Sequence, residues 1–169
     1  MDAELGATTA VFPSDEQTCL FLNSEGHNAD WAEIKADDGC SYDVHDEIDI
    51  AGLEPLIAKP SSPDNVVKVQ EAAGLPIYPA YIGSSVNPGF RDFAIAAQMV
   101  RENQVAPAVS FDINPTSRQI LDNLTREGHL ANLIHAGARI HQAGCNGCAG
   151  MGQAPASGKH TLGTTPLKV

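Results

Sequence analysis

The sequence predicts an α/β fold built on a mostly parallel β-sheet. From residue 77 onward, apolar segments of strand length alternate with amphipathic segments of helix length. Glycine-rich loops follow two of the predicted strands. A strand–helix–strand–helix–strand order favours parallel strands with helices packed against the sheet.

Residues 1–58 are expected to form one block of the chain. Ser14 is predicted to begin a helix, because acidic residues follow it and Gln17 completes a capping box. Cys19, Leu20 and Phe21 are expected to form the buried face of this helix. The other elements expected here are a short helix over 30–34, a turn at 37–39 and a half-buried strand carrying Val44, Ile48 and Ile50.

Residues 59–76 read as a linker, since prolines and polar residues dominate their first half. Residues 77–152 are expected to form the main α/β domain, and 153–169 a C-terminal loop or tail. The expected strands of the main domain are 77–82, 108–113 and 138–142, and its expected helices are 90–101, 117–127 and 130–135.

This order of elements predicts the position of a functional site. In open α/β sheets, sites lie at the carboxyl ends of the strands. The loops expected there are 83–89, 114–116 and 144–150. Ser85 in the first loop should therefore lie close to Cys145 and Cys148 in the third.

Cys145 and Cys148 are three positions apart in a glycine-rich loop, so both sulfurs can reach one metal centre. A redox dithiol and a purely structural pair are the alternatives. The pair follows a predicted strand but opens no clear helix. This argues against a redox dithiol, because thioredoxin-like sites use a helix N-terminus to stabilise the thiolate.

The composition of the chain bears on whether it binds nucleic acids or membranes and on its cellular location. The chain has 169 residues, 43% of them hydrophobic, and a formal net charge of −11. It contains no cluster of Lys and Arg, which argues against nucleic-acid binding. No apolar run approaches the roughly 20 residues of a membrane span, and the start lacks the pattern of a signal peptide. With four cysteines and no disulfide framework, a cytoplasmic location is expected.

Four segments of the chain form a distinctive combination: Ala3–Thr9 with Val11–Pro13, Tyr81–Asn87, Asn114–Ser117 and Cys145–Pro155. In their order and spacing they resemble the aconitase family of iron–sulfur hydro-lyases. The resemblance covers almost the whole chain, and the combination of segments is highly specific.

The resemblance implies a three-layer α/β/α fold, with residues 1–58 as the end of a preceding α/β domain. It also implies a [4Fe-4S] cluster bound by three cysteines. The fourth iron of such a cluster binds the substrate hydroxyl and carboxylate. By this resemblance Cys145 and Cys148 are the second and third metal ligands, and Ser85 occupies the position of the first. Glu4 falls on the catalytic glutamate that helps to position water.

The chain also departs from the family pattern. Ser85 offers a hydroxyl, which is a poorer ligand for a soft iron–sulfur centre than a thiolate. Family members are several times longer, and the substrate-binding arginine that follows the cysteine loop has no counterpart. We therefore expect a fragment of a hydro-lyase, inactive by itself, with weak self-association through uncovered apolar faces.

In the full-length context the substrate is expected to be a small di- or tricarboxylate. The stretches Ala7–Thr9 and Phe12–Pro13 favour the aconitase branch, acting on citrate and isocitrate in the tricarboxylic acid cycle, over isopropylmalate isomerases. The alternative function is a non-catalytic metal- or partner-binding module on the same fold.

For several single residues, a purely structural role is an alternative to the functional one. Ser85 can be a loop serine that caps the helix starting near Pro88. Cys40 reads as a loop thiol, with a role as substitute third ligand the alternative. His141 reads as a packed strand histidine rather than a ligand, and Cys19 as a core residue.

Overall fold

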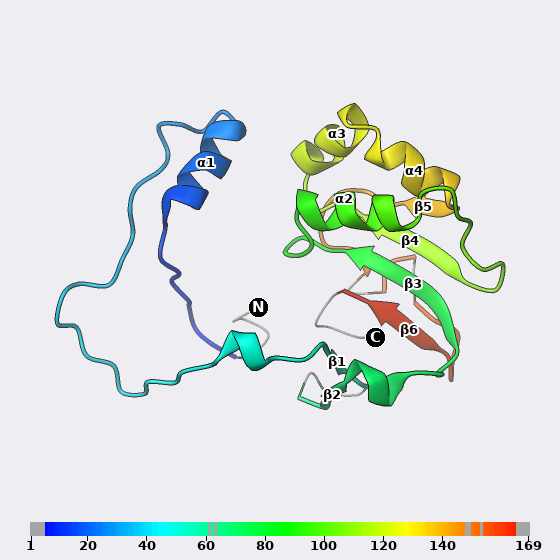
Figure 1. Ribbon diagram of the computed structural model, residues 1–169, viewed down its shortest axis with the longest axis horizontal. Helices are drawn as coiled ribbons and strands as arrows, with labels where there is room; N and C mark the ends of the chain where they lie inside the picture. Colours follow the sequence, from blue (N-terminus) through cyan, green and yellow to red (C-terminus); the bar gives the residue numbers. More distant parts are fainter. Residues whose placement is uncertain (1–5, 61, 63, 148–149, 153, 165–169) are drawn as a thin grey trace. The chain divides into compact units, whose positions relative to one another are not determined.

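The computed structural model describes residues 6–60, 62, 64–147, 150–152 and 154–164 (Figure 1). The chain divides into two compact units, Met1–Leu53 and Glu54–Val169. The predicted α/β fold with a parallel sheet is confirmed in the second unit. The division falls before the expected linker 59–76, so those residues belong to the second unit.

The N-terminal unit contains the helix α1 (Glu16–Ser24) and the short 3₁₀ helix η2 (Ile50–Gly52). The prediction that Ser14 caps α1 is wrong by one residue. The Asp15 carboxylate is the cap, accepting a hydrogen bond from the Thr18 amide at 3.0 Å. Ser14 instead forms an isolated antiparallel bridge with Ile34.

Three further predictions for this unit are wrong. The described residues form no helix over 30–34 and no strand at 44–50, where Val44, Ile48 and Ile50 are 71–79% exposed. Leu20 and Phe21 of α1 are also more than half exposed, and Cys19 is half-buried. Amphipathic patterns stabilise helices and strands mainly through packing of the apolar face, and these residues have little packing within the unit. The predicted turn at 37–39 is confirmed, since the Cys40 amide donates to the Asp37 carbonyl at 3.2 Å.

Four parallel strands form the sheet of the C-terminal unit, in the order β5-β4-β3-β6. Registers such as Tyr81 opposite Asp112, and Asp112 opposite Arg139, align the carboxyl ends of β3, β4 and β5. The strands are β3 (Ile77–Gly83), β4 (Ser110–Asn114), β5 (Ala138–Ile140) and β6 (His160–Gly163).

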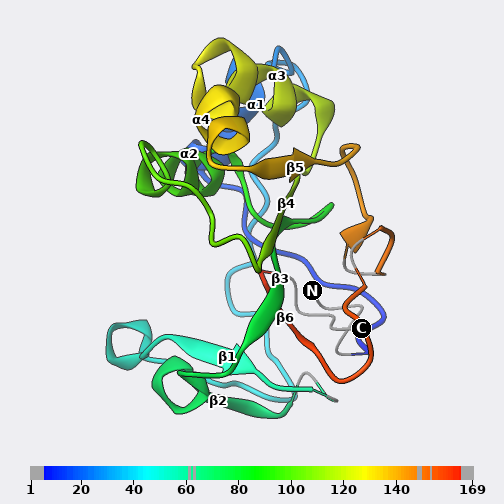
Figure 2. The same cartoon turned by 90° about the vertical axis from the view of Figure 1, so that its right-hand side faces the viewer.

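Three helices cover one face of this sheet: α2 (Phe90–Met99), α3 (Arg118–Arg126) and α4 (His129–His135). Figure 2 shows them grouped on the same side of β4 and β5. Phe111 and Ile113 of β4 pack against them, together with the fully buried side chains of Phe93, Leu124 and Leu133. The alternate residues of β4 face the other side of the sheet, where the polar site is built. In the described part of the chain, no helix is both long and apolar enough to cross a bilayer.

Two segments expected to be irregular contain regular structure. The expected linker includes the β2 strand (Val66–Lys68) of an antiparallel hairpin with β1 (Leu56–Ala58), followed by the 3₁₀ helix η3 (Val69–Ala72). Pro60 lies in the loop of this hairpin and so interrupts neither strand. The expected tail contains β6, which is short and gains its stability from pairing with β3.

Ser117 caps α3, and its hydroxyl oxygen accepts a hydrogen bond from the Ile120 amide at 3.2 Å. We expect Ser117→Ala to lower the free energy of unfolding by about 1 kcal/mol, because an amide of the first turn loses its partner. Urea unfolding followed by circular dichroism measures this change. Ser117→Asp restores an acceptor and should recover most of the loss; equal losses in both variants would contradict the capping role.

Candidate metal centre at the carboxyl edge of the sheet

The loops that follow β3 and β5 are fastened to the turn that follows β4. The Thr116 hydroxyl donates to the Pro88 carbonyl of the first loop. The Gly144 amide of the cysteine loop donates to the Pro115 carbonyl at 3.0 Å. The two glycine-rich loops are therefore attached to one short segment, at the edge where the sequence predicted a site.

The predicted site residues are only partly described. Cys145 and Ser85 are exposed in their loops, whereas Glu4 and Cys148 lie outside the described residues. Among the residues the structure describes, no three His, Cys, Asp or Glu side chains are close enough to hold a metal ion. The ligand set Cys145, Cys148 and Ser85 thus stays a prediction.

The alternative role for Ser85, capping the next helix, is wrong. The N-cap of α2 is Gly89, whose amide donates to the Asp92 carboxylate at 3.0 Å. The neighbouring Ser84 is the structural serine of this loop. It is buried, and its hydroxyl donates to the Asn87 carbonyl at 3.3 Å and accepts from the Val86 amide at 3.4 Å. Ser85 is left exposed, with its hydroxyl available for another role.

Gly83 allows the end of β3 to approach the end of β4 closely. Its φ of +129° lies in the region that favours glycine. A Cβ at this position would lie 1.9 Å from the carbonyl oxygen of Asn114, and no side chain fits there. The Gly83 amide donates a hydrogen bond to the Thr164 hydroxyl at 3.1 Å.

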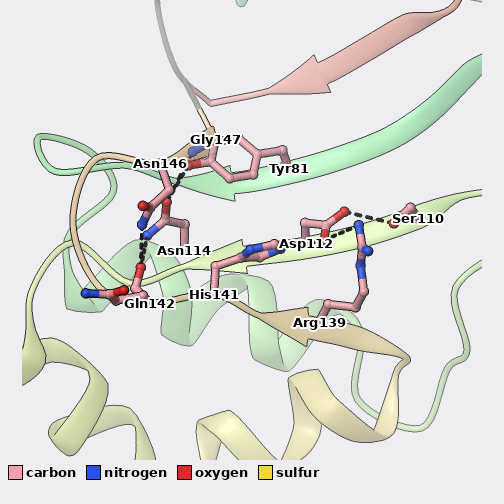
Figure 3. Close-up of polar contacts among 9 residues, drawn as sticks. All are labelled: Tyr81, Ser110, Asp112, Asn114, Arg139, His141, Gln142, Asn146 and Gly147. Atoms are coloured by element: carbon pink, nitrogen blue, oxygen red, sulfur yellow. Dashed lines mark hydrogen bonds and ion pairs between the residues drawn. The ribbon is translucent and has the colours of Figure 1, made fainter. Parts of the chain in front are cut away.

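The side chain of Asn114 is fully buried and joins β3 to the cysteine loop (Figure 3). Its Oδ1 accepts from the Tyr81 hydroxyl at 2.9 Å and from the Gly147 amide at 3.4 Å. Its Nδ2 donates to the Gln142 carbonyl at 2.8 Å. Gln142 and Gly147 lie on either side of Cys145, so one amide group contacts both arms of the loop.

Asp112 is a second fully buried polar residue on the same face of β4 (Figure 3). Its Oδ1 is 2.7 Å from both Arg139 Nη2 and His141 Nε2, and its Oδ2 accepts from the Ser110 hydroxyl at 2.9 Å. Burial opposes ionisation, but the hydrogen bonds from Arg139, His141 and Ser110 outweigh it and lower the pKa of the Asp112 carboxyl. The hydrogen bond to Asp112 raises the pKa of the Arg139 guanidinium in turn.

The sequence interpretation missed Asp112 as a site residue, and it gave Asn114 no role of its own although it placed loop 114–116 at this edge. One signal was available for Asp112, which is polar and alternates with apolar residues in the predicted strand 108–113. His141, expected to be a packed histidine, lies just after β5 and is mostly buried against Asp112. Its ring therefore supports the sheet beneath the cysteine loop.

We expect Asp112→Asn to lower the free energy of unfolding by about 1–3 kcal/mol at pH 7, because charged hydrogen bonds are lost. A lowered pKa in the folded state gives stability that is present above the unfolded pKa and is lost as the pH falls through the folded pKa. The difference between the two proteins should therefore shrink below about pH 4. Urea unfolding between pH 7 and pH 3 tests this.

Asp122→Asn is the matched control, since Asp122 pairs with Arg126 at 2.7 Å on the exposed surface. It should cost about 0–1 kcal/mol. A difference between Asp112→Asn and the unmodified chain that stays constant with pH would contradict the role assigned to the Asp112 charge.

Comparison with known proteins identifies the family. The profile of the Aconitase family (aconitate hydratase) matches residues 1–76 and 70–165. This chain belongs to the aconitase family. Both glycine-rich loops and the whole parallel sheet lie within the matched residues of this aconitase-family chain.

Relatives of this aconitase-family chain include large subunits of 3-isopropylmalate dehydratases and of a probable homoaconitase. It is 31% identical over 153 residues to 3-isopropylmalate dehydratase large subunit 2 of Archaeoglobus fulgidus, covering 90% of this chain and 37% of the relative. It is 37% identical over 150 residues to the protein of the same name from Rubrobacter xylanophilus, covering 89% and 35%. A probable methanogen homoaconitase large subunit of Methanothermobacter thermautotrophicus is 30% identical over 150 residues, covering 89% and 35%. The chain thus spans little more than a third of the length of these relatives.

Proposed function

We propose that this chain carries the metal-binding edge of a hydro-lyase, an enzyme that removes water from a hydroxy acid and adds it back. Family membership along almost the whole chain is the observation that carries the proposal. The fold supports it, because the loop with Cys145 is attached to the carboxyl edge of a parallel sheet, where α/β enzymes bind their ligands.

We propose a substrate of the isopropylmalate type, a hydroxylated dicarboxylate with an apolar branch. The sequence favoured citrate or isocitrate through Ala7–Thr9 and Phe12–Pro13. The names of the relatives favour the other branch, since they are 3-isopropylmalate dehydratases and a probable homoaconitase. The same names, each a large subunit, suggest that a separate small subunit completes the enzyme, and we expect no turnover by this chain alone.

The proposed cofactor is a [4Fe-4S] cluster held by Cys145 and Cys148 with Ser85 at the third position. The two thiols have the soft donor chemistry that such a cluster requires, whereas the Ser85 hydroxyl is a weaker donor. The exposure of Cys145 and Ser85 leaves both side chains accessible to a bound group. When bound, the cluster supplies a Lewis acid for the substrate hydroxyl.

The chain's own residues have separate tasks in this proposal. Glu4 is proposed to position the water that is added or removed, and it requires a packed environment to do so. Asp112 is fully buried and holds the side chains of Arg139 and His141 on the face of the sheet below the cysteine loop. The exposed part of the Arg139 guanidinium offers a positive charge there to a substrate carboxylate.

Anaerobic reconstitution of the reduced chain with iron and sulfide tests the proposal. We expect a broad visible absorbance and protein-bound iron, both lost in Cys145→Ser. Cys19→Ser is the matched control, because Cys19 is a half-buried thiol of α1 in the N-terminal unit with no proposed ligand role, and its loss should not affect loading. Equal iron binding and absorbance in Cys145→Ser and the unmodified chain would refute the role of the cysteine loop.

A further inference from the structure

The Asn114 side chain uses its whole hydrogen-bonding capacity at the end of β4. The oxygen accepts from Tyr81 and from the Gly147 amide. The nitrogen donates to the Gln142 carbonyl at 2.8 Å and to the Pro115 carbonyl at 3.3 Å. Rotating the amide by 180° would place its NH₂ group against the Gly147 N–H, which can only donate, and its oxygen against two carbonyl acceptors. The surroundings therefore favour the orientation described.

These bonds fix the cysteine loop on both sides of Cys145. Gln142 precedes the cysteine and Gly147 follows it, and both contact the same amide group (Figure 3). The Asn146 side chain closes the loop further by donating to the Gln142 carbonyl at 2.7 Å. The loop conformation is thus connected to a fully buried residue of the sheet rather than to its own residues alone.

We infer that Asn114 is a positioning residue that orders the cysteine loop before a metal binds, and so sets the affinity of the site for soft metal ions. This inference rests on the proposed function, in which Cys145 and Cys148 are the ligands. If the loop is already ordered in the folded chain, metal binding does not incur the entropic cost of ordering it. Groups that orient metal ligands from behind typically change metal affinity 10- to 100-fold when they are removed.

Titration of the full reduced chain with Cd²⁺ under anaerobic conditions tests the inference. Cadmium is a probe for thiolates, and its thiolate-to-metal absorbance in the ultraviolet reports binding without any enzyme activity. We expect Asn114→Ala to weaken Cd²⁺ binding about 10- to 100-fold. Tyr81→Phe leaves both bonds from Asn114 to the loop in place and should weaken binding by less than about 3-fold.

Ile113→Val is the matched control for general loosening of the sheet. Ile113 is the neighbour of Asn114 in β4, is fully buried, and packs in the core on the helical face. This variant should leave Cd²⁺ affinity unchanged. If Asn114→Ala does not fold, Asn114→Asp serves instead, since it keeps an acceptor for Gly147 but cannot donate to Gln142 and should also bind Cd²⁺ more weakly.

The outcomes separate this inference from the proposed function. No Cd²⁺ binding by the unmodified chain would overturn the cysteine site and the positioning role together. Tight binding by the unmodified chain, with Asn114→Ala or its substitute Asn114→Asp within about 3-fold of it, would overturn the positioning role alone. An equal loss in Ile113→Val would also overturn it, because the effect would then come from stability and not from the loop.

Discussion

Ser85→Cys is expected to increase the amount of iron–sulfur cluster that this chain retains. The change replaces a hydroxyl by a thiol at the position where the family resemblance places the first ligand. Thiolates bind iron–sulfur centres far better than hydroxyls do. After anaerobic reconstitution, iron and sulfide bound per chain should rise, and loss of the visible absorbance in air should slow at least about tenfold.

Two comparisons make this prediction specific. Ser62→Cys adds a thiol in the exposed hairpin loop between β1 and β2, which belong to a sheet separate from the four parallel strands, and should leave cluster content unchanged. The double variant with Cys145→Ser should lose the gain, because the new thiol needs the cysteine loop. A Ser85→Cys chain that loads no better than the unmodified chain would show that Ser85 does not reach the metal.

Gly83→Ala is expected to cause the largest loss of stability of any single methyl addition among the described glycines. The added Cβ would lie 1.9 Å from the Asn114 carbonyl oxygen and 2.6 Å from its carbonyl carbon, both backbone atoms. Relief requires separating β3 from β4 where they are paired in parallel. We expect a cost of more than about 4 kcal/mol, a large part of the stability of an ordinary domain.

Gly74→Ala measures the cost of placing alanine at a positive φ without a steric clash. Comparing it with Gly83→Ala therefore gives the cost of the clash with Asn114. Gly74 also has a positive φ, +84°, but nothing lies within 4 Å of the position of its Cβ. It should cost only about 1–2 kcal/mol. Urea unfolding of both variants measures the difference, and similar losses would contradict the close approach of β3 to β4.

The main sheet could be predicted from sequence because each of its elements carries a local signal. The strand at 77–83 and the helices that begin near Phe90 and Arg118 follow their periodicity closely. The elements that failed depend on distant partners. The apolar residues at 44–50 have too little packing within their unit to form a strand, whereas β6 forms because the edge of β3 pairs with it.

The location of the site could be predicted from the sequence, but its polar contacts could not. Topology and glycine content located both loops, because the carboxyl ends of parallel strands share one edge. The polar contacts beneath the loops were not predictable in the same way. Asn114 meets Tyr81 and Gly147 across sequence separations of 33 residues each, and Asp112 meets His141 across 29. The local pattern of apolar and polar residues contains no information about contacts between residues so far apart in the sequence.

The order of the strands has a consequence for the integrity of the site. The strands β5 and β6 form opposite borders of the sheet, so the chain between them must cross from one border to the other. This connection contains Cys145 and Cys148. A protease that cuts at the exposed Lys159 would detach the four-residue β6 covalently while leaving the thiol-bearing segment tied to β4. The molecule would then be a nicked complex, in which pairing with β3 helps to retain the severed strand.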